Sequence, residues 1–280
     1  MKIAIIGASS FIGFRFFTHL RGQFDVVGTY FKHQKHQEMV RLDISQQADV
    51  ELFIKTYMPD TILWVAGSKD LTLTEDNLEY AYSVNTYPLS YLIWSIDKLD
   101  NYHPRVVFFS TDYVFDGVRG NYRHTDTPTP QTNYGISNQK AEYLLQHNYD
   151  NAIIIRTSAV MGKGGTFFDF LVSNLQTKEV LELYDDTIFT PTPMALLIQC
   201  VMDLLCGSYT NDILHICGSS VYTRYSFGMQ IRQILQSQNP SSKLAQIIPV
   251  KSQVNKQRLF FPNLSLVSSF PLDDYRSELI

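Results

Sequence analysis

Two short stretches of the sequence carry hydroxyl groups that could together move a proton. Ser110 and Thr111 open the stretch "STDYVFDG" directly after an apolar run, and Tyr134 opens the stretch "YGISNQKAE". A tyrosine hydroxyl can donate a proton to a developing alkoxide while a threonine hydroxyl polarises the same oxygen. The combination suits hydride transfer to a carbonyl, with Thr111 and Tyr134 as the catalytic hydroxyls.

The residue four places after Tyr134 bears on whether that hydroxyl could work near neutral pH. A free tyrosine titrates near pH 10, so a positive charge on the same helix face would help it. Positions i and i+4 share a face of a helix, and position i+4 is Asn138. Lys140 is rotated by roughly 120° and is expected to face solvent. Asn138 could hydrogen-bond a ribose hydroxyl and is included in the catalytic group, but it brings no charge.

A glycine-containing turn near the start of the chain is a candidate phosphate loop. In "IAIIGASSFIG", Gly7, Ser10 and Gly13 lie between an apolar run and a helical pattern. Backbone N–H groups at a helix N-terminus favour phosphate, Gly7 would allow the tight turn, and Gly13 would allow close helix–strand packing. Ser10 stands where a glycine usually lets pyrophosphate approach. The pattern favours a dinucleotide site, and a structural turn is the alternative.

The ends of the next two strands bear on which dinucleotide would bind. The second strand ends "VVGTYFKH" with no acidic residue to hold the ribose 2′-hydroxyl of NAD, and Lys32 lies there instead. This favours NADP slightly over NAD, although a solvated basic loop explains Lys32 equally well. Asp43 ends the third strand and could meet an adenine edge or cap a helix.

These residues need a scaffold, and the first half of the chain alternates apolar runs with helical patterns. Such alternation predicts an α/β protein with a Rossmann-type, doubly wound parallel sheet. We expect a dinucleotide-binding domain over residues 1–156 and a smaller substrate lobe over 157–280, with a strand near 212–218 returning to the sheet. The expected strands are 2–6, 24–30, 39–43, 61–67, 105–110 and 151–156, and the expected helices are 11–20, 49–57, 76–98 and 134–147.

Composition excludes several classes of protein. The chain has 280 residues, 45% of them apolar, and a net charge of −4, which argues against a nucleic-acid surface. No run is long enough for a membrane helix and no signal peptide is recognisable, so we expect a soluble cytoplasmic protein without a membrane partner. The three cysteines read as buried free thiols, and no His/Cys/carboxylate pattern completes a metal site.

Taken together, the motifs resemble the extended short-chain dehydrogenase/reductases, and most closely their dTDP-4-dehydrorhamnose reductase branch. The resemblance rests first on "STDYVFDG", and then on "VNTYPLSYL", "YRHTDTPTPQTNYG", "RTSAVMG" and "LHICG", which are spread over most of the chain. It implies an NAD(P)H-binding Rossmann domain and a lobe for a nucleotide sugar, and relatives form dimers through the helices corresponding to 76–98 and 134–147. A homodimer is therefore an expectation. The chain departs from the family pattern at Ser10 and Asn138.

The resemblance also extends the set of site residues. We assign to the cofactor Gly7, Ser10, Phe11, Ile12, Gly13, Thr29, Lys32, Asp43, Ile44, Ala66, Gly67, Asn85 and Ser110. We assign to the substrate Asp112, Tyr113 and Ser158.

Three functions remain open at this point. The first is reduction of a nucleotide-linked keto sugar by Tyr134 and Thr111. The second is a non-catalytic nucleotide- or sugar-binding role, for which the regulatory subunit of methionine adenosyltransferase in this branch is a precedent by resemblance. The third, ranked last, is epimerisation or dehydration on the same fold.

Overall fold

The computed structural model describes residues 1–207, 212–252 and 261–270. They form two compact units, each treated by itself below. Unit 1 contains residues 1–114, 127–156 and 201–214, and unit 2 contains the remaining segments, beginning at 115, 157 and 215. The division differs in two places from a single boundary at Arg156: segment 115–126 belongs to unit 2, and segment 201–214 belongs to unit 1.

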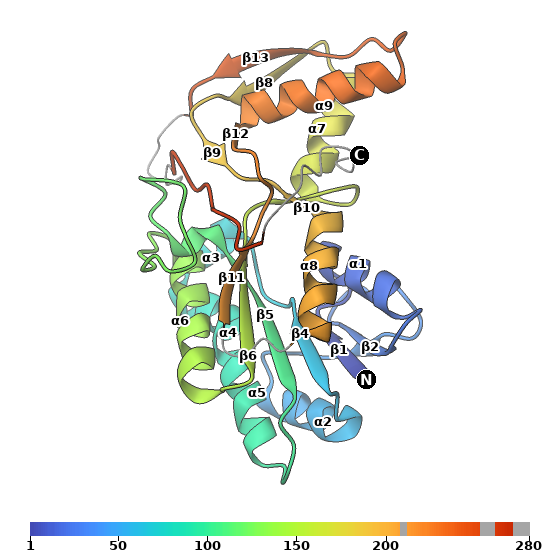
Figure 1. Ribbon diagram of the computed structural model, residues 1–280, viewed down its shortest axis with the longest axis vertical. Helices are drawn as coiled ribbons and strands as arrows, with labels where there is room; N and C mark the ends of the chain where they lie inside the picture. Colours follow the sequence, from blue (N-terminus) through green and yellow to red (C-terminus); the bar gives the residue numbers. More distant parts are fainter. Residues whose placement is uncertain (208–211, 253–260, 271–280) are drawn as a thin grey trace. The chain divides into compact units, whose positions relative to one another are not determined.

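Unit 1 is built on a seven-stranded sheet with the order β11-β6-β5-β4-β1-β2-β3 (Figure 1). The pairs β1–β2, β1–β4, β2–β3 and β4–β5 are parallel. The strands are β1 (Lys2–Ile6), β2 (Asp25–Tyr30), β3 (Val40–Arg41), β4 (Thr61–Trp64), β5 (Arg105–Thr111), β6 (Ala152–Thr157) and β11 (Asp212–Ile216). Successive strands run outward from β1 in both directions, which confirms the predicted doubly wound sheet.

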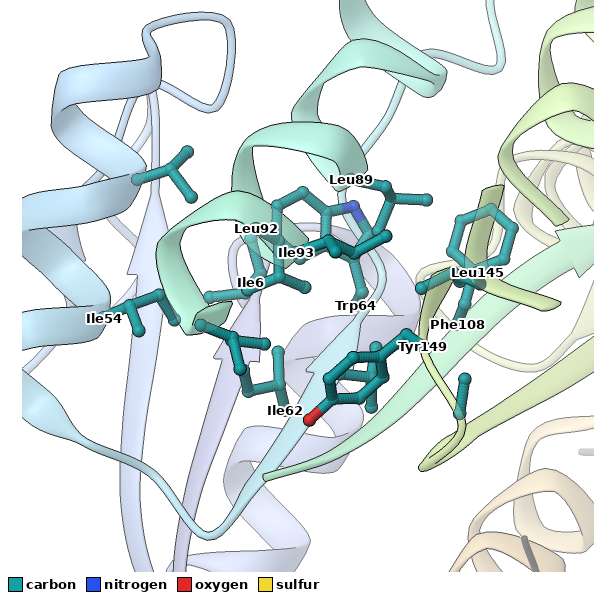
Figure 2. Packing of buried hydrophobic residues seen from close by; sticks show 14 of the residues in the cluster. Ile6, Ile54, Ile62, Trp64, Leu89, Leu92, Ile93, Phe108, Leu145 and Tyr149 are labelled. Atoms are coloured by element: carbon teal, nitrogen blue, oxygen red, sulfur yellow. The ribbon is translucent and has the colours of Figure 1, made fainter. Parts of the chain in front are cut away.

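Helices cover both faces of this sheet because its strands are apolar on both sides. Their bounds are α1 (Phe11–Leu20), α2 (Gln47–Tyr57), α3 (Leu71–Asp76), α4 (Leu78–Asn85), α5 (Tyr87–Asp97) and α6 (Asn133–Asn148), and α8 spans Met194–Cys206. Side chains from α2, α5 and α6 pack with alternate residues of β1, β4, β5 and β6 in one buried cluster (Figure 2). On β5, Val106 and Phe108 belong to this cluster, whereas Phe109 points to the other face and meets Phe16 of α1, with ring centroids 5.4 Å apart.

The prediction of one continuous helix over 76–98 was wrong. The segment forms α4 and α5, which meet at Thr86, and α3 precedes them. Pro88 lies in the first turn of α5, where its missing N–H costs nothing but would interrupt a continuous helix. Thr86 donates its hydroxyl to the carbonyl of Ser137 at 2.7 Å, which fixes the break against α6.

Unit 2 contains short paired strands and two helices around its own core. β8 (Val180–Tyr184) pairs in parallel with β13 (Gln246–Val250), β7 (Val160–Met161) pairs with β10 (Thr192–Pro193), and β9 (Ile188–Phe189) pairs with β12 (Tyr222–Thr223). The apolar faces of α7 (Thr166–Thr177) and α9 (Arg224–Gln238) pack into this core. Within the described part of the chain, no helix has the length and hydropathy needed to cross a bilayer.

Candidate active site

The predicted phosphate loop lies at the point where the sheet changes direction. β1 is flanked by β2 on one side and β4 on the other, so the turns after β1 and β4 diverge at this position. Gly7 follows β1 with φ +89°, and a Cβ there would lie 2.9 Å from the Cα of Ala66, which follows β4. Open α/β sheets bind ligands at such switch points, beyond the carboxyl ends of the strands.

Ser10 caps helix α1 in place of the usual glycine. Its Oγ accepts a hydrogen bond from the Gly13 N–H at 3.0 Å, and its own φ is −70°, so this position does not require glycine. The hydroxyl proton is still able to serve a ligand, as are the N–H groups of Phe11 and Ile12 in the first turn. Gly13 is required, because a Cβ there would lie 2.3 Å from the Gly7 carbonyl oxygen.

The other residues assigned to the cofactor make different kinds of contact. Thr29 is buried and its hydroxyl accepts a hydrogen bond from the Gly7 N–H at 2.9 Å, so it stabilises the loop from the protein interior. Lys32 is exposed beside the ring of Phe31. Asp43 accepts from both the N–H and the hydroxyl of Ser45, and Ile44 packs against the core cluster.

Asn85 ties the turn after β4 to helix α6. Its Oδ1 accepts from the Ser68 N–H at 2.8 Å, and its Nδ2 donates to the Ser137 hydroxyl at 3.1 Å. Gly67, with φ +153°, leaves room for this amide, because a Cβ there would lie 2.7 Å from Oδ1. Asn85 therefore links the predicted cofactor side of the sheet to the helix that carries Tyr134.

Thr111 and Tyr134 are brought together as the sequence predicts. Thr111 ends β5 and Tyr134 lies in the first turn of α6, where the Thr111 hydroxyl is close enough to act on the Tyr134 phenol. The Thr111 hydroxyl donates to Asp112 Oδ1 at 3.1 Å. The ring of Tyr113 meets that of Tyr134 edge to face, with centroids 5.7 Å apart, so two of the residues assigned to the substrate adjoin the pair.

The surroundings of Tyr134 favour its protonated form. Burial raises its pKa to about 12, the Thr111 hydroxyl opposes this rise, and the negative charge of Asp112 adds to it. Near neutral pH the phenol is therefore fully protonated and can donate its proton, but it is a weak acid.

Asn138 does not lower this pKa. It is buried, and its Nδ2 donates to the Tyr134 carbonyl at 2.8 Å, one turn back along α6. Because a carbonyl oxygen can only accept a hydrogen bond, the Asn138 amide is oriented with Nδ2 towards Tyr134. Its Oδ1 is then left to accept a hydrogen bond from another group. Lys140 is exposed, with its ammonium 5.1 Å from the ring of Tyr143.

Two site residues have contacts that the sequence assignment did not anticipate. Ser110 donates its hydroxyl to Glu142 in the interior of unit 1. Ser158 lies in unit 2, where it is buried and its hydroxyl has no hydrogen-bond partner among the described residues.

Two carboxylates near the pair were missed by sequence reasoning. Glu75 of α3 accepts from the Tyr134 N–H at 3.2 Å and so satisfies one free donor at the start of α6. Glu142 lies eight residues after Tyr134 and forms a buried ion pair with Arg156 of β6. The signal for Glu142 was available, since it follows Asn138 by four residues on the same helix face. The described residues contain no group of three His, Cys, Asp or Glu side chains arranged to hold a metal ion.

With this geometry, the family can be assigned. The family model described as "RmlD substrate binding domain" matches residues 1–270. The chain belongs to this family. The match covers both units, so it accounts for the Rossmann sheet and for the second core together.

Individual relatives agree with the assignment. The chain is 30% identical over 194 residues to the spore coat polysaccharide biosynthesis protein SpsK of Bacillus subtilis (strain 168), covering 69% of this chain and 67% of that protein. It is 29% identical over 197 residues to the dTDP-4-dehydrorhamnose reductase of Aggregatibacter actinomycetemcomitans, covering 68% and 66%. Each match therefore spans about two thirds of the relative.

A solved structure has the same fold over nearly the whole chain. The dTDP-4-dehydrorhamnose reductase from Bacillus anthracis str. Ames, in complex with NADP, superposes with a TM-score of 0.86 at 20% identity. The superposition covers 99% of this chain and 96% of that one.

Proposed function

We propose that this protein is an NAD(P)H-dependent reductase of a nucleotide-linked keto sugar, similar to dTDP-4-dehydrorhamnose reductase. The observation that carries the proposal is the placement of Thr111, at the carboxyl end of β5, beside Tyr134 of α6. This pair lies on the same edge of the sheet as the capped turn after β1. The names of the relatives and the NADP in the B. anthracis reductase support it.

The turn after β1 fits a dinucleotide pyrophosphate. Gly7 and Gly13 allow the turn to pack closely, because a Cβ at either position would clash with neighbouring backbone, and the hydroxyl of Ser10 retains a proton to donate. Lys32 would favour the extra phosphate of NADP over NAD by its charge. When bound, the cofactor would supply the hydride.

The protein's own groups would then control the proton. Thr111 polarises the substrate oxygen, and Tyr134 donates its phenolic proton to that oxygen as negative charge develops. Asn138 offers Oδ1 to a ribose hydroxyl of the cofactor, and this contact would position the ribose without adding charge. Asp112, Tyr113 and Ser158 are the proposed substrate contacts.

One observation favours a second candidate, a non-catalytic nucleotide- or sugar-binding protein. Burial raises the pKa of Tyr134 to about 12, and Asn138 carries no charge to lower it. We rank this candidate second because a binding protein has no chemical need for two adjacent hydroxyls at the carbonyl position.

The proposal can be tested by binding and turnover in sequence. Purified protein is titrated with NADPH and with NADH while nicotinamide fluorescence is followed, and dTDP-4-dehydro sugars are then added to the complex. The proposal predicts binding, tighter for NADPH, and loss of the fluorescence on addition of a keto sugar. Binding without turnover on any keto sugar would favour the second candidate, and no binding of either cofactor would exclude the reductase.

A further inference from the structure

A buried polar cluster joins Ser110, the chain neighbour of Thr111, to helix α6, which carries Tyr134. Glu142 of α6 accepts from Arg156 twice: Nε donates to Oε1 at 3.0 Å and Nη2 donates to Oε2 at 2.7 Å. The hydroxyl of Ser110 donates to Oε1 as well. One carboxylate thus joins β5, β6 and α6, all within unit 1.

The Glu142–Arg156 ion pair is not well explained by a contribution to folding stability alone. Glu142 is 2% exposed and Arg156 is 1% exposed, so both charges have lost their hydration. A buried pair recovers this cost only with excellent geometry, and apolar residues of similar volume often serve equally well or better. The two-pronged contact instead fixes direction, because a guanidinium fork binds a carboxylate in one plane.

The cluster connects the two elements that carry Thr111 and Tyr134, so it could set the relative position of these two side chains. Strand residues alternate between faces, so Ser110 shares a face with Val106 and Phe108, and Arg156 shares a face with Ile154. Ser110 is bonded in the chain to Thr111. Glu142 lies one helical turn beyond Asn138 on the same face of α6, and Tyr134 lies in the first turn of that helix.

We propose that Glu142 is a positioning residue, which through Ser110 and Arg156 holds Thr111 of β5 beside Tyr134 of α6. The proposal rests on the proposed reductase function. Apolar contacts between α6 and the sheet tolerate small slides of the helix, whereas the fork and the serine hydroxyl do not. Displacement of a reacting group by about 1 Å can cost about 100-fold in rate.

The decisive variant removes both charges together. Glu142→Leu/Arg156→Met replaces the pair with apolar side chains of similar length, so neither charge is left buried alone. The Tm should fall slightly, because the buried Ser110 hydroxyl loses its acceptor. The cofactor Kd should also stay the same, since neither residue reaches the phosphate turn. We expect kcat to fall by about 10- to 100-fold with little change in KM. A folded double variant with wild-type kcat would overturn the proposal.

Two further variants provide an independent test and a matched control. Ser110→Ala leaves the ion pair intact but releases β5 from it, and kcat should fall by about fivefold, as for the loss of one hydrogen bond. If the double variant does not fold, wild-type kcat in Ser110→Ala overturns the proposal. The matched control is Glu51→Gln/Lys98→Met, which removes an ion pair between α2 and the end of α5 and should leave kcat unchanged.

A readout without turnover separates this proposal from the reductase proposal. The ¹³Cζ resonance of Tyr134, assigned by its loss in Tyr134→Phe, reports the proximity of the Thr111 hydroxyl in the protein alone. The double variant should shift this resonance and raise the midpoint of its titration, because the Thr111 hydroxyl lowers the pKa of Tyr134. An unchanged resonance would overturn the positioning role even if the wild type reduced no keto sugar.

Discussion

Asn138→Lys should lower the pKa of Tyr134 and speed the chemical step. Burial holds this pKa at about 12, and no cation lies on the Tyr134 face of α6 at position 138. A lysine ammonium placed about 5 Å from the phenol would interact by about 3 kcal/mol at an effective dielectric constant of about 20. That corresponds to about two pKa units, which is within the range that a neighbouring opposite charge produces.

The sign of the effect follows from the direction of the reaction. Reduction needs the protonated phenol, so its rate should be level up to the pKa and fall above it. Oxidation of the alcohol needs the phenolate, so its rate should rise with pH up to the same pKa. Asn138→Lys should move both breaks downward by about two pH units, and a more acidic phenol should raise kcat for reduction by about tenfold near neutrality.

The assay is the pH dependence of pre-steady-state NADPH oxidation and of the reverse reaction. Asn138→Met is the matched control, because it has nearly the length of lysine without the charge. Both substitutions lose the hydrogen bond from Nδ2 to the Tyr134 carbonyl, at a cost of about 1 kcal/mol of stability. Identical pH profiles for the lysine and methionine variants would refute the electrostatic reasoning.

Three other predictions follow from the same unit. Gly13→Ala should abolish cofactor binding by fluorescence titration, since its Cβ would meet the Gly7 carbonyl oxygen at 2.3 Å; binding at wild-type affinity would contradict the proposed phosphate turn. Lys32→Ala should weaken NADPH by about tenfold and leave NADH unchanged, and an equal loss for both would remove Lys32 from the phosphate contact. Stability should decline above pH 10, measured by urea unfolding, because burial raises the pKa of Tyr149 above the unfolded value and the folded state therefore favours the neutral phenol. Tyr149→Phe should make that decline shallower while losing about 1 kcal/mol at neutral pH, and an unchanged slope would contradict this origin.

Local patterns were enough to predict the sheet and the pairing of its key hydroxyls. Continuous apolar runs marked the strands of unit 1, and the spacing of Tyr134 and Asn138 placed both on α6. Pro88 was a signal for the break at Thr86, because a proline interrupts a continuous helix, whereas the hydrogen bond that fixes the break is donated by Thr86 to residue 137, which lies far away in the sequence. Segments 115–126 and 201–214 were assigned by position along the chain, whereas their membership of a unit depends on contacts between residues far apart in sequence.

The contacts of the site residues were harder to foresee. Ser110 was assigned to the cofactor because it ends a strand, but its alternation with Phe108 directs it towards α6. Its bond to Glu142 depends on a partner 32 residues away. Ser10 looked like a loss from the phosphate loop, and only the backbone angles reveal that a helix cap replaces the glycine.

The most direct test of the account is deuteride transfer from 4-deuterated NADPH to a dTDP-4-dehydro sugar, followed by mass spectrometry of the sugar. Transfer to the carbonyl carbon by the wild type, slowed by about 100-fold or more in Tyr134→Phe, is the predicted result. A sugar product without deuterium, or equal transfer by Tyr134→Phe, would contradict the assignment of Tyr134 as the proton donor of a reductase.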